Sequence, residues 1–381
     1  MDKSGTLEVA ICGAGPAGMA LAALLVQRGL APGRIALLDA RTLEQASADP
    51  RTLALSYGST RILAEAGAWP IESTAIHQIH VSRRGRFGRS LIERADHGVP
   101  ALGYVARYGD VVGALGAACA KRGIAALRPA RVLGCREDAD GVTLEIEQDG
   151  AARPLRAALV VQAEGGLFGD QQGRAVHRDY EQTGIIAMIR VSAPVAHRAF
   201  ERFTDEGPLA LLPQGDQYAL VWCVRPECAQ RLLALDEAAF LAELEHTFGG
   251  RLGRFIKAGE RLGYPLGLSA TPPTSARAVA IGNAAQTMHP AAGQGLNLGL
   301  RDVAVLARVL AQGANPAGLA DYLRLRRPDR DLTMRVTDTL ARIFAGDTPA
   351  QTLLGASLGL VDLLNPARKA LAELLMYGRR H

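Results

Sequence analysis

Aromatic residues are scarce in this sequence of 381 residues, of which they make up only 5%. Proteins that hold single-stranded nucleic acid stack its bases on aromatic side chains, so the scarcity argues against that function. Blocks of like charge are missing as well, and no basic stretch singles out nucleic acid as a partner. The net charge of +5 leaves two interpretations open: a slightly arginine-rich surface, or attraction to an anionic membrane or cofactor.

Cysteine is sparse too, and no C-x-x-C pair or zinc-like histidine spacing accompanies it, which argues against a dithiol redox centre and a zinc finger. The scattered residues are Cys12, Cys119, Cys135, Cys223 and Cys228. Long apolar runs are missing, so no segment is long enough to span a bilayer. The first residues run straight into a strand and lack the apolar core of a signal peptide. These absences predict a protein of the reducing cytoplasm.

Glycine, by contrast, is plentiful, and its 42 residues gather in clusters. Residues 8–12 are typical of a buried strand, GAGPAG occupies 13–18, a helix runs to Gly29, and a second strand ends near Asp39. In such a unit one glycine permits the tight turn, one lets the backbone approach a diphosphate, and one lets helix and strand pack closely. These three are Gly13, Gly15 and Gly18.

The turn predicts a dinucleotide site. The helix N-terminus presents free N–H groups and a positive dipole end to phosphates. Asp39 is placed to accept both hydroxyls of an adenosine ribose, and its charge disfavours a 2′-phosphate. The ligand expected here is therefore FAD or NAD rather than NADP.

The rest of the chain favours a domain assembled from separated pieces. The regular strand–helix succession of a dehydrogenase stops after Asp39, and no second G-x-G-x-x-G occurs. Strand-like segments recur at 158–166, ending in Glu164–Gly165, and at 278–286, containing Gly282–Asn283. The chain between about 176 and 264 is rich in strand patterns. A length of 381 residues also suits two or more structural units.

These motifs give the sequence a family resemblance. They are GAGPAG (13–18) with Asp39, DPRTLALS (49–56), VVQAEGG (160–166), GNAAQTMHPAAGQGLNLGLRD (282–302) and YLRLRRPDR (322–330). Over nearly its full length the chain resembles the class A flavoprotein aromatic hydroxylases, the single-component FAD monooxygenases. Within them it is most similar to the ubiquinone-biosynthesis branch that hydroxylates 2-polyprenyl-6-methoxyphenol. Most relatives carry Gly-Asp-Ala-Ala-His where this chain has Asn283 and Gln286, a variant associated with that branch.

The resemblance implies an α/β fold, with a Rossmann-like FAD-binding domain (GR2-type), an inserted β-sheet substrate domain and a C-terminal helical tail. The implied boundaries are 1–75, 100–175 and 265–345 for the discontinuous FAD-binding domain, 76–99 and 176–264 for the substrate-binding sheet domain, and 346–381 for the C-terminal helical segment. That segment has two open interpretations: a helix packed on the domain, or a surface facing lipid or a partner.

The resemblance also implies site residues. The cofactor-binding set is Gly13, Gly15, Pro16, Ala17, Gly18, Asp39, Arg51, Arg107, Glu164, Gly282, Asn283, Pro290, Gly293, Gln294, Gly295, Leu296 and Asn297. The substrate pocket would be lined by Pro213, Tyr218, Trp222, Tyr264 and Pro265. His289 is the candidate catalytic base, with a structural or flavin-supporting role as the alternative. Glu164 stands where the family usually has aspartate, so its contact would be shifted or indirect. No metal site is expected.

The implied activity uses FAD, NADPH or NADH as a transient reductant, and O2, and it hydroxylates a polyprenylated phenol in ubiquinone biosynthesis through a C4a-hydroperoxyflavin. Two alternatives stay open: a hydroxylase of another aromatic substrate on the same scaffold, and a non-catalytic flavin-binding subunit of a quinone-biosynthesis complex. We expect a cytoplasmic location, with peripheral contact at the inner membrane through the C-terminal segment as a further interpretation.

Overall fold

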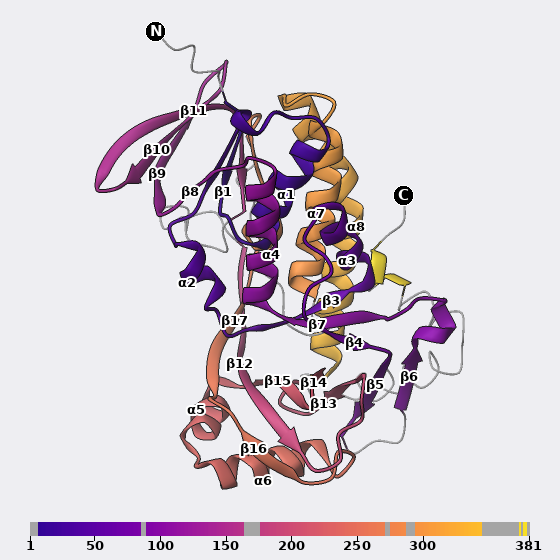
Figure 1. Ribbon diagram of the computed structural model, residues 1–381. Coiled ribbons are helices and arrows are strands. Elements are labelled where there is room, and N and C mark those ends of the chain that lie inside the picture. The colour runs from indigo at the N-terminus through magenta and orange to yellow at the C-terminus, as the bar shows by residue number, and fades with distance from the viewer. Residues whose placement is uncertain are drawn as a thin grey trace.

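The structure is a computed structural model that describes residues 7–84, 89–163, 176–270, 275–286, 294–344, 373–374 and 376–378. Its strands form three sheets, with sheet A at one end of the molecule, sheet C at the other and sheet B between them (Figure 1). The helices are α1 (Pro16–Gln27), α2 (Leu43–Ser47), α3 (Tyr57–Glu65), α4 (Tyr108–Lys121), α5 (Pro226–Ala234), α6 (Glu237–Phe248), α7 (Gln294–Leu310) and α8 (Pro316–Phe344), with short 3-10 turns η1 (Pro32–Arg34), η2 (Arg94–His97) and η3 (Gly282–Ala284).

Sheet A holds the predicted dinucleotide unit. Its order is β8 (Ala126–Leu127), β2 (Ile35–Leu38), β1 (Leu7–Cys12), β11 (Ala151–Gln162), β10 (Val142–Gln148) and β9 (Ala130–Glu137), with β18 (Ala278–Ala280) also paired to β11. β1 runs parallel to both β2 and β11, and β18 runs parallel to β11. The parallel strands therefore end at one edge, where ligands bind in open α/β sheets.

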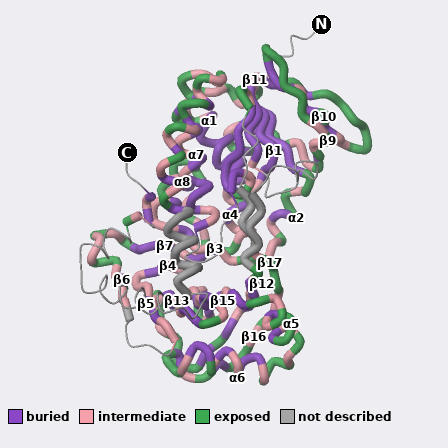
Figure 2. Tube along the Cα trace, turned by 180° about the vertical axis from the view of Figure 1, so that it is seen from behind, coloured by how far each residue is buried: buried purple, intermediate pink, exposed green. Residues whose placement is uncertain are grey.

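Both faces of sheet A are buried, which explains the continuous apolar runs of its strands (Figure 2). Side chains alternate along each strand. Ile11 and Leu37 pack toward α1, α4 and α7, whereas Cys12 and Leu38 pack toward the strands β9 and β10. Cys12 is thus a small buried core residue.

Sheet C is the second large sheet, and helices lie on one of its faces. Its order is β16 (Phe255–Ala258), β12 (Val176–Val191), β15 (Gln217–Val224), β14 (Pro208–Gln214), β13 (Arg198–Phe203), β5 (Gln78–Arg83) and β6 (Arg89–Glu93), with β17 (Leu262–Ala270) also paired to β12. Helices α5 and α6 cover one face, because their apolar side chains share a core with that face of the sheet. Strands β5 and β6 come from the early part of the chain, and β5 lies parallel to β13.

Sheet B links the two ends. It consists of β3 (Thr52–Ser56), β7 (Gly103–Arg107) and β4 (Thr74–Ile76). Ile76 and Val105 pack against Ala199 of β13 in a small core between sheets B and C. The long pair β12 and β17 also runs between the two ends of the molecule (Figure 1). The expected α/β fold, with a separate sheet beside the dinucleotide unit, is confirmed.

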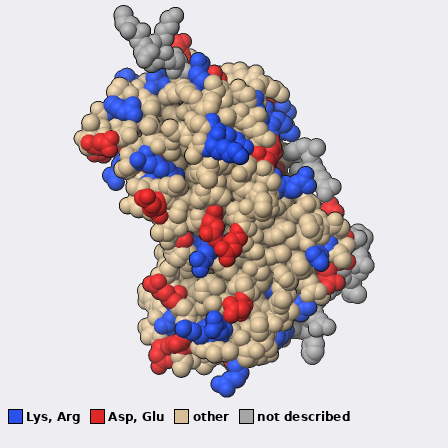
Figure 3. Space-filling view, viewed as in Figure 1, with Lys and Arg blue, Asp and Glu red and all other residues tan. Residues whose placement is uncertain are grey.

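Little of the expected C-terminal helical segment, 346–381, belongs to the described residues. Met376 is buried beside Ile92 and Leu102, and Tyr377 makes an edge-to-face contact with Tyr57 at 6.2 Å between ring centroids. Among the described residues, no helix has the length and apolar character needed to cross a bilayer. Lys and Arg are interleaved with Asp and Glu over the face shown in Figure 3, so the net charge of +5 does not form one basic stripe there.

Candidate active site

The turn between β1 and α1 has the backbone that the glycines predict. Gly13 has φ +106°, a region that strongly favours glycine, and its N–H donates to the carbonyl of Leu38 at 2.8 Å. A Cβ at Gly18 would lie 1.9 Å from the carbonyl oxygen of Gly13, so no side chain fits there. α1 begins at Pro16 directly after the turn, and its first N–H groups are available to an anion.

Asp39 lies against this turn and has 7% of its surface exposed. Its Oδ2 accepts the N–H of Ala14 at 2.9 Å, and its Oδ1 accepts the N–H of Arg41 at 2.9 Å. A carboxylate has about four lone-pair sites, so it retains capacity for two further donors such as ribose hydroxyls. The carboxylate both orders the turn and remains able to bind a ligand.

Arg128 was not predicted from the sequence, yet it sits on the same turn. Its Nη2 donates to the carbonyl of Ala14 and lies 4.0 Å from a carboxylate oxygen of Asp39. The side chain is 8% exposed, and Nη1 has no hydrogen-bond partner in the part of the chain that the structure describes. Burial lowers the pKa of this guanidinium, against the opposing effect of Asp39. No sequence motif marks an arginine that follows a short edge strand, so its position beside the turn is known only from the structure.

Motifs far apart in the sequence meet beside this turn. The N–H of Ala163 donates to the carbonyl of Cys12 at 2.7 Å, which aligns the ends of β1 and β11. A Cβ at Gly282 would lie 3.5 Å from the Cβ of Ala17, and one at Gly299 would lie 3.0 Å from the Cα of Gly282. The start of α1, η3 and α7 therefore approach one another through small residues.

The N-terminus of α7 is the second candidate ligand surface. Gln294 is buried, whereas Gly295 and Leu296 are half-buried. Asn283 is exposed, and its side-chain oxygen lies 3.7 Å from where a Cβ of Gly295 would stand. The predicted residues Glu164, His289, Pro290 and Gly293 lie outside the described residues.

Asn297 is engaged with sheet B. Its Oδ1 accepts the N–H of Ser56 at 2.9 Å, and its Nδ2 donates to the carbonyl of Ala54 at 2.9 Å. The amide thus bridges two backbone groups of β3 and ties the start of α7 to the segment that carries the DPRTLALS motif. This placement favours a role for Asn297 in shaping the site.

The two predicted arginines are both exposed. Arg51 bonds Asp49 with Nε and Nη2, at 2.9 and 2.6 Å, and its guanidinium lies 4.9 Å from the ring centroid of Tyr108. The hydrogen bond to Asp49 raises the pKa of Arg51 against the effect of burial. The hydroxyl of Tyr108 lies 3.4 Å from where a Cβ of Gly15 would stand, which places this cluster beside the turn of residues 13–18. Arg107 precedes α4, and no contact of its side chain is described.

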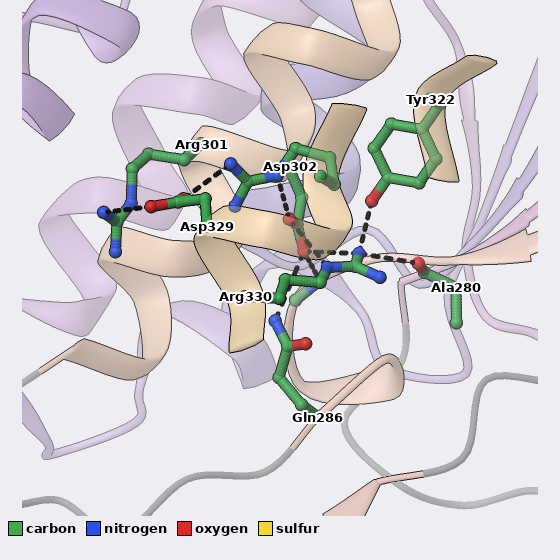
Figure 4. A network of polar contacts seen from close by, with 9 residues as sticks. Ala280, Gln286, Arg301, Asp302, Tyr322, Asp329 and Arg330 are labelled. Atoms are coloured by element: carbon green, nitrogen blue, oxygen red, sulfur yellow. Dashed lines mark hydrogen bonds and ion pairs between the residues drawn. The ribbon is translucent and has the colours of Figure 1, made fainter. Parts of the chain in front are cut away.

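A buried polar network fixes both ends of the segment between η3 and α7 (Figure 4). Asp302 of α7 accepts the N–H of Gly282 at 3.2 Å, Nε of Arg326 at 2.7 Å and Nη2 of Arg330 at 2.9 Å. Arg301 lies 3.4 Å from Asp329.

Further members extend the network. Arg330 donates to Tyr322 and to the carbonyl of Ala280, and Arg301 reaches Oε1 of Gln294 at 3.5 Å. Arg326 and Arg330 come from the YLRLRRPDR segment, for which the sequence patterns predicted no role, whereas Arg301 belongs to α7. An aspartate within the apolar stripe of a helix was the signal that could have found it, because a buried charge needs partners.

The predicted substrate residues fall into two places. Tyr218 and Trp222 lie in the core between sheet C and helices α5 and α6, and the Tyr218 hydroxyl donates to the carbonyl of Val195 at 2.9 Å. This placement favours packing as their role. Tyr264 is 40% exposed, and Pro265 beside it is exposed on β17. Pro213 is buried on β14.

The site fits a dinucleotide on three observations. Side chains are excluded at Gly18, the carboxylate of Asp39 retains capacity for donors, and Arg128 presents a buried N–H that lacks an acceptor among the described residues. Helix dipole, ribose acceptor and cation are the elements that a diphosphate and its adenosine require.

A family model described as an FAD binding domain matches residues 6–336. The chain therefore belongs to this family and is an FAD-dependent aromatic-ring monooxygenase of class A, as the sequence motifs predicted.

Individual relatives narrow the comparison. The chain is 35% identical to the ubiquinone hydroxylase UbiL of Rhodospirillum rubrum, over 95% of this chain and 87% of that protein. It is 30% identical to the 3-demethoxyubiquinol 3-hydroxylase of Escherichia coli, over 80% of this chain and 79% of that protein. Among solved structures, p-nitrophenol 4-monooxygenase PnpA of Pseudomonas putida matches with a TM-score of 0.78 and 18% identity, over 99% of both chains. That likeness concerns the fold, and the sequence relatives confirm the resemblance to the ubiquinone branch.

Proposed function

We propose that this protein hydroxylates a polyprenylated phenol in ubiquinone biosynthesis, with FAD as cofactor, NADH or NADPH as reductant and O2 as the oxygen source. The observation that carries the proposal is the similarity over most of the chain to two proteins named as a ubiquinone hydroxylase and a 3-demethoxyubiquinol 3-hydroxylase. The chain covers 87% and 79% of their lengths, so the comparison includes most of both proteins.

The cofactor would be held from both ends of the site. The turn of residues 13–18 would hold the diphosphate through the N-terminus of α1, and Asp39 would accept the ribose hydroxyls. Arg128 would donate its Nη1–H, which lacks an acceptor among the residues that the structure describes, to an oxygen of the same half of the cofactor. Gly282, Asn283 and the α7 terminus at 294–297 would face the flavin, together with Pro290 and Gly293, and the dipole of α7 would favour negative charge there.

Once bound and reduced, FAD supplies the O2 chemistry. The task of this chain is then to orient the phenol, exclude water and manage the phenol proton. His289, beside the flavin motif in sequence, stays a candidate for the proton. Tyr264 and Pro265, on β17, stay candidates for contact with substrate entering between the two ends of the molecule.

Deleting the gene in its host and measuring the quinones tests this function. We expect ubiquinone to fall and a prenylated phenol that lacks one hydroxyl to accumulate, with recovery on re-expression of the wild-type chain. An unchanged quinone profile would contradict the pathway assignment. Recovery by a variant that binds no FAD would favour the non-catalytic subunit, and turnover of small aromatic acids without quinone loss would favour another aromatic substrate.

The same strain tests the membrane interpretation. We propose that residues 346–381 bring the protein to the membrane where a polyprenyl substrate resides. Fractionation of cells with and without this segment would measure it, and an unchanged membrane fraction on its removal would contradict it.

A further inference from the structure

Glu201 lies on the face of sheet C opposite helices α5 and α6. Its neighbours on β13 point the other way: Phe200 packs in the core with α6, and Nε of Arg202 donates to the carbonyl of Thr247 of α6 at 3.0 Å. Because successive side chains of a strand alternate between faces, Glu201 points away from α5 and α6.

That face turns toward the cofactor half of the molecule. Ala199, on the same face of β13, packs against Ile76 and Val105 of sheet B. At the start of β3, the hydroxyl of Thr52 donates to Oε1 of Gln214 on β14 at 3.0 Å.

The other end of β3 is bound to the flavin-side helix, since Asn297 of α7 bonds the backbone of Ala54 and Ser56. A strand rises roughly 3.3 Å per residue, so this five-residue strand spans only about 13 Å between sheet C and the α7 terminus.

Apolar residues surround Glu201 on this face. The residues paired with it across the neighbouring strands, in a row, are Val81, Ala210, Val221 and Ile186. Each of them is half-buried, whereas Leu211, Leu220 and Ile185 on the covered face are fully buried. The row is therefore an apolar, half-buried strip of the sheet that contains the carboxyl group of Glu201.

The carboxyl group of Glu201 makes no hydrogen bond or ion pair with any described residue. Burial raises its pKa to about 7. Cys223 on β15 is the titratable neighbour on this face, and burial and the charge of Glu201 raise its thiol pKa. Strand parity places Arg83 of β5 and Arg190 of β12 on the same face of the sheet as Glu201, and the raised pKa of Glu201 follows from burial.

We propose that Glu201 binds the ring hydroxyl of the substrate and accepts its proton, while the apolar row around it receives the prenyl-bearing edge of the ring. This inference rests on the proposed function, because it takes a prenylated phenol as the substrate. In the step, the phenol O–H bond breaks and an O–H bond forms on the carboxylate. The resulting phenolate donates more electron density to the ring carbons, which makes them better acceptors of an electrophilic oxygen.

A glutamate with a raised pKa suits this task better than an ordinary glutamate would. A phenol has a pKa near 10 in water. The raised pKa of Glu201, about 7, is closer to that value than the pKa of an ordinary glutamate is, so proton transfer costs less free energy. The apolar surroundings strengthen the hydrogen bond between them. The competing assignment of the base is His289, and the experiment separates the two.

Three variants of the FAD-loaded protein test the proposal: Glu201→Gln, Glu201→Leu and His289→Gln. Glu243→Gln is the matched control, since Glu243 is an exposed residue of α6 whose carboxylate lies 3.4 Å from Arg231. The probes are 2-geranylphenol and its methyl ether. Binding is followed by the flavin absorbance change, and turnover by product formation between pH 5.5 and 9.

The wild-type rate should rise as the pH passes about 7, because ionised Glu201 is the base. Glu201→Gln should lose this rise and about 100-fold in kcat at pH 8, with Kd changed less than about threefold, since an amide still accepts the hydrogen bond. Glu201→Leu should weaken binding of the phenol about tenfold and leave binding of the methyl ether unchanged. Glu243→Gln should match the wild type.

A wild-type pH profile in Glu201→Gln, or loss of the rise in His289→Gln alone, would overturn the proposal. The proposal would also be overturned if Glu201→Leu and the wild type bound the phenol in preference to its methyl ether by the same factor. The binding comparison needs no turnover, so it tests the role of Glu201 even if the wild type fails to hydroxylate the phenol, which would instead contradict the proposed function. Flavin content and thermal unfolding of each variant show that it is folded.

Discussion

The two halves of the site are built from different materials. The cofactor half is shaped by glycine, by backbone groups and by charges that pair with one another, as at Gly18 and in the Asp302 network. On the proposed substrate half, an apolar face of sheet C carries Glu201, which has no partner among the described residues. The difference teaches that glycine backbone and internal ion pairs shape the cofactor half, whereas the proposal for the other half depends on one side chain, Glu201.

Gly18→Ala should break the cofactor half most severely. The new Cβ would collide with the carbonyl oxygen of Gly13 and push α1 from β1, so FAD affinity should fall at least about 100-fold. Fluorescence titration with FAD measures the change. Gly33→Ala is the control, because a Cβ there meets no atom within 4 Å. Equal affinities of the two variants would show that the turn does not hold the cofactor.

Asp302→Asn should be the next largest disruption. It leaves the buried guanidinium groups of Arg326 and Arg330 without their full counter-charge, which costs about 3–5 kcal/mol when one partner of a buried pair is removed. Urea unfolding provides the free energy. Asp321→Asn removes an exposed pair with Arg324 and should change stability by less than about 1 kcal/mol. Similar losses in both variants would mean that the network is not the anchor of α7.

Arg128→Gln separates binding from folding within the cofactor half. The guanidinium N–H has no partner among the described residues, which predicts an acceptor on the cofactor, and we expect about a tenfold loss of FAD affinity. Titration at two salt concentrations measures this loss and its charge dependence. Arg131→Gln, on the exposed start of β9, is the control. An unchanged affinity in Arg128→Gln would place this side chain outside the FAD contacts.

Glu201→Gln should change stability less than Asp302→Asn does, and the size of the change depends on pH. The folded pKa of about 7 exceeds the usual glutamate value, so stability falls as the pH rises from about 4.3 toward 7. The amide avoids this loss, so the variant should be more stable than the wild type at pH 8, by on the order of 2 kcal/mol, and nearly equal at pH 4.5. Thermal unfolding at both pH values checks this. A difference that does not vary with pH would contradict the burial of an ionisable group at 201.

The cofactor half could be predicted because its signals are local. Spacing alone placed the glycines of 13–18 at the strand–helix turn and Asp39 at the next strand end, and the structure agrees on both. The segment 282–302 was singled out by its family motif, and its described ends lie beside α1 and β3. Arg128 was missed, since its role depends on a strand pairing between β2 and β8 that no local pattern encodes.

The substrate half could not be predicted in the same way, because strand parity decides which side chains face the ligand. Moving one position along a strand changes the face completely. The family resemblance proposed Tyr218 and Trp222 as pocket residues, but they lie on the helix-covered face. Glu201 is an ordinary glutamate in the sequence, and only the pairing of β13 with β5 and β14 shows its apolar surroundings.

The most direct measurement supplies the purified, FAD-loaded protein with 2-geranylphenol, NADPH or NADH, and oxygen-18 gas. Mass spectrometry should find one oxygen-18 atom in a hydroxylated ring, formed in proportion to the reductant consumed. A protein that takes up no FAD, or one that consumes reductant without placing labelled oxygen in any phenol, would contradict the account.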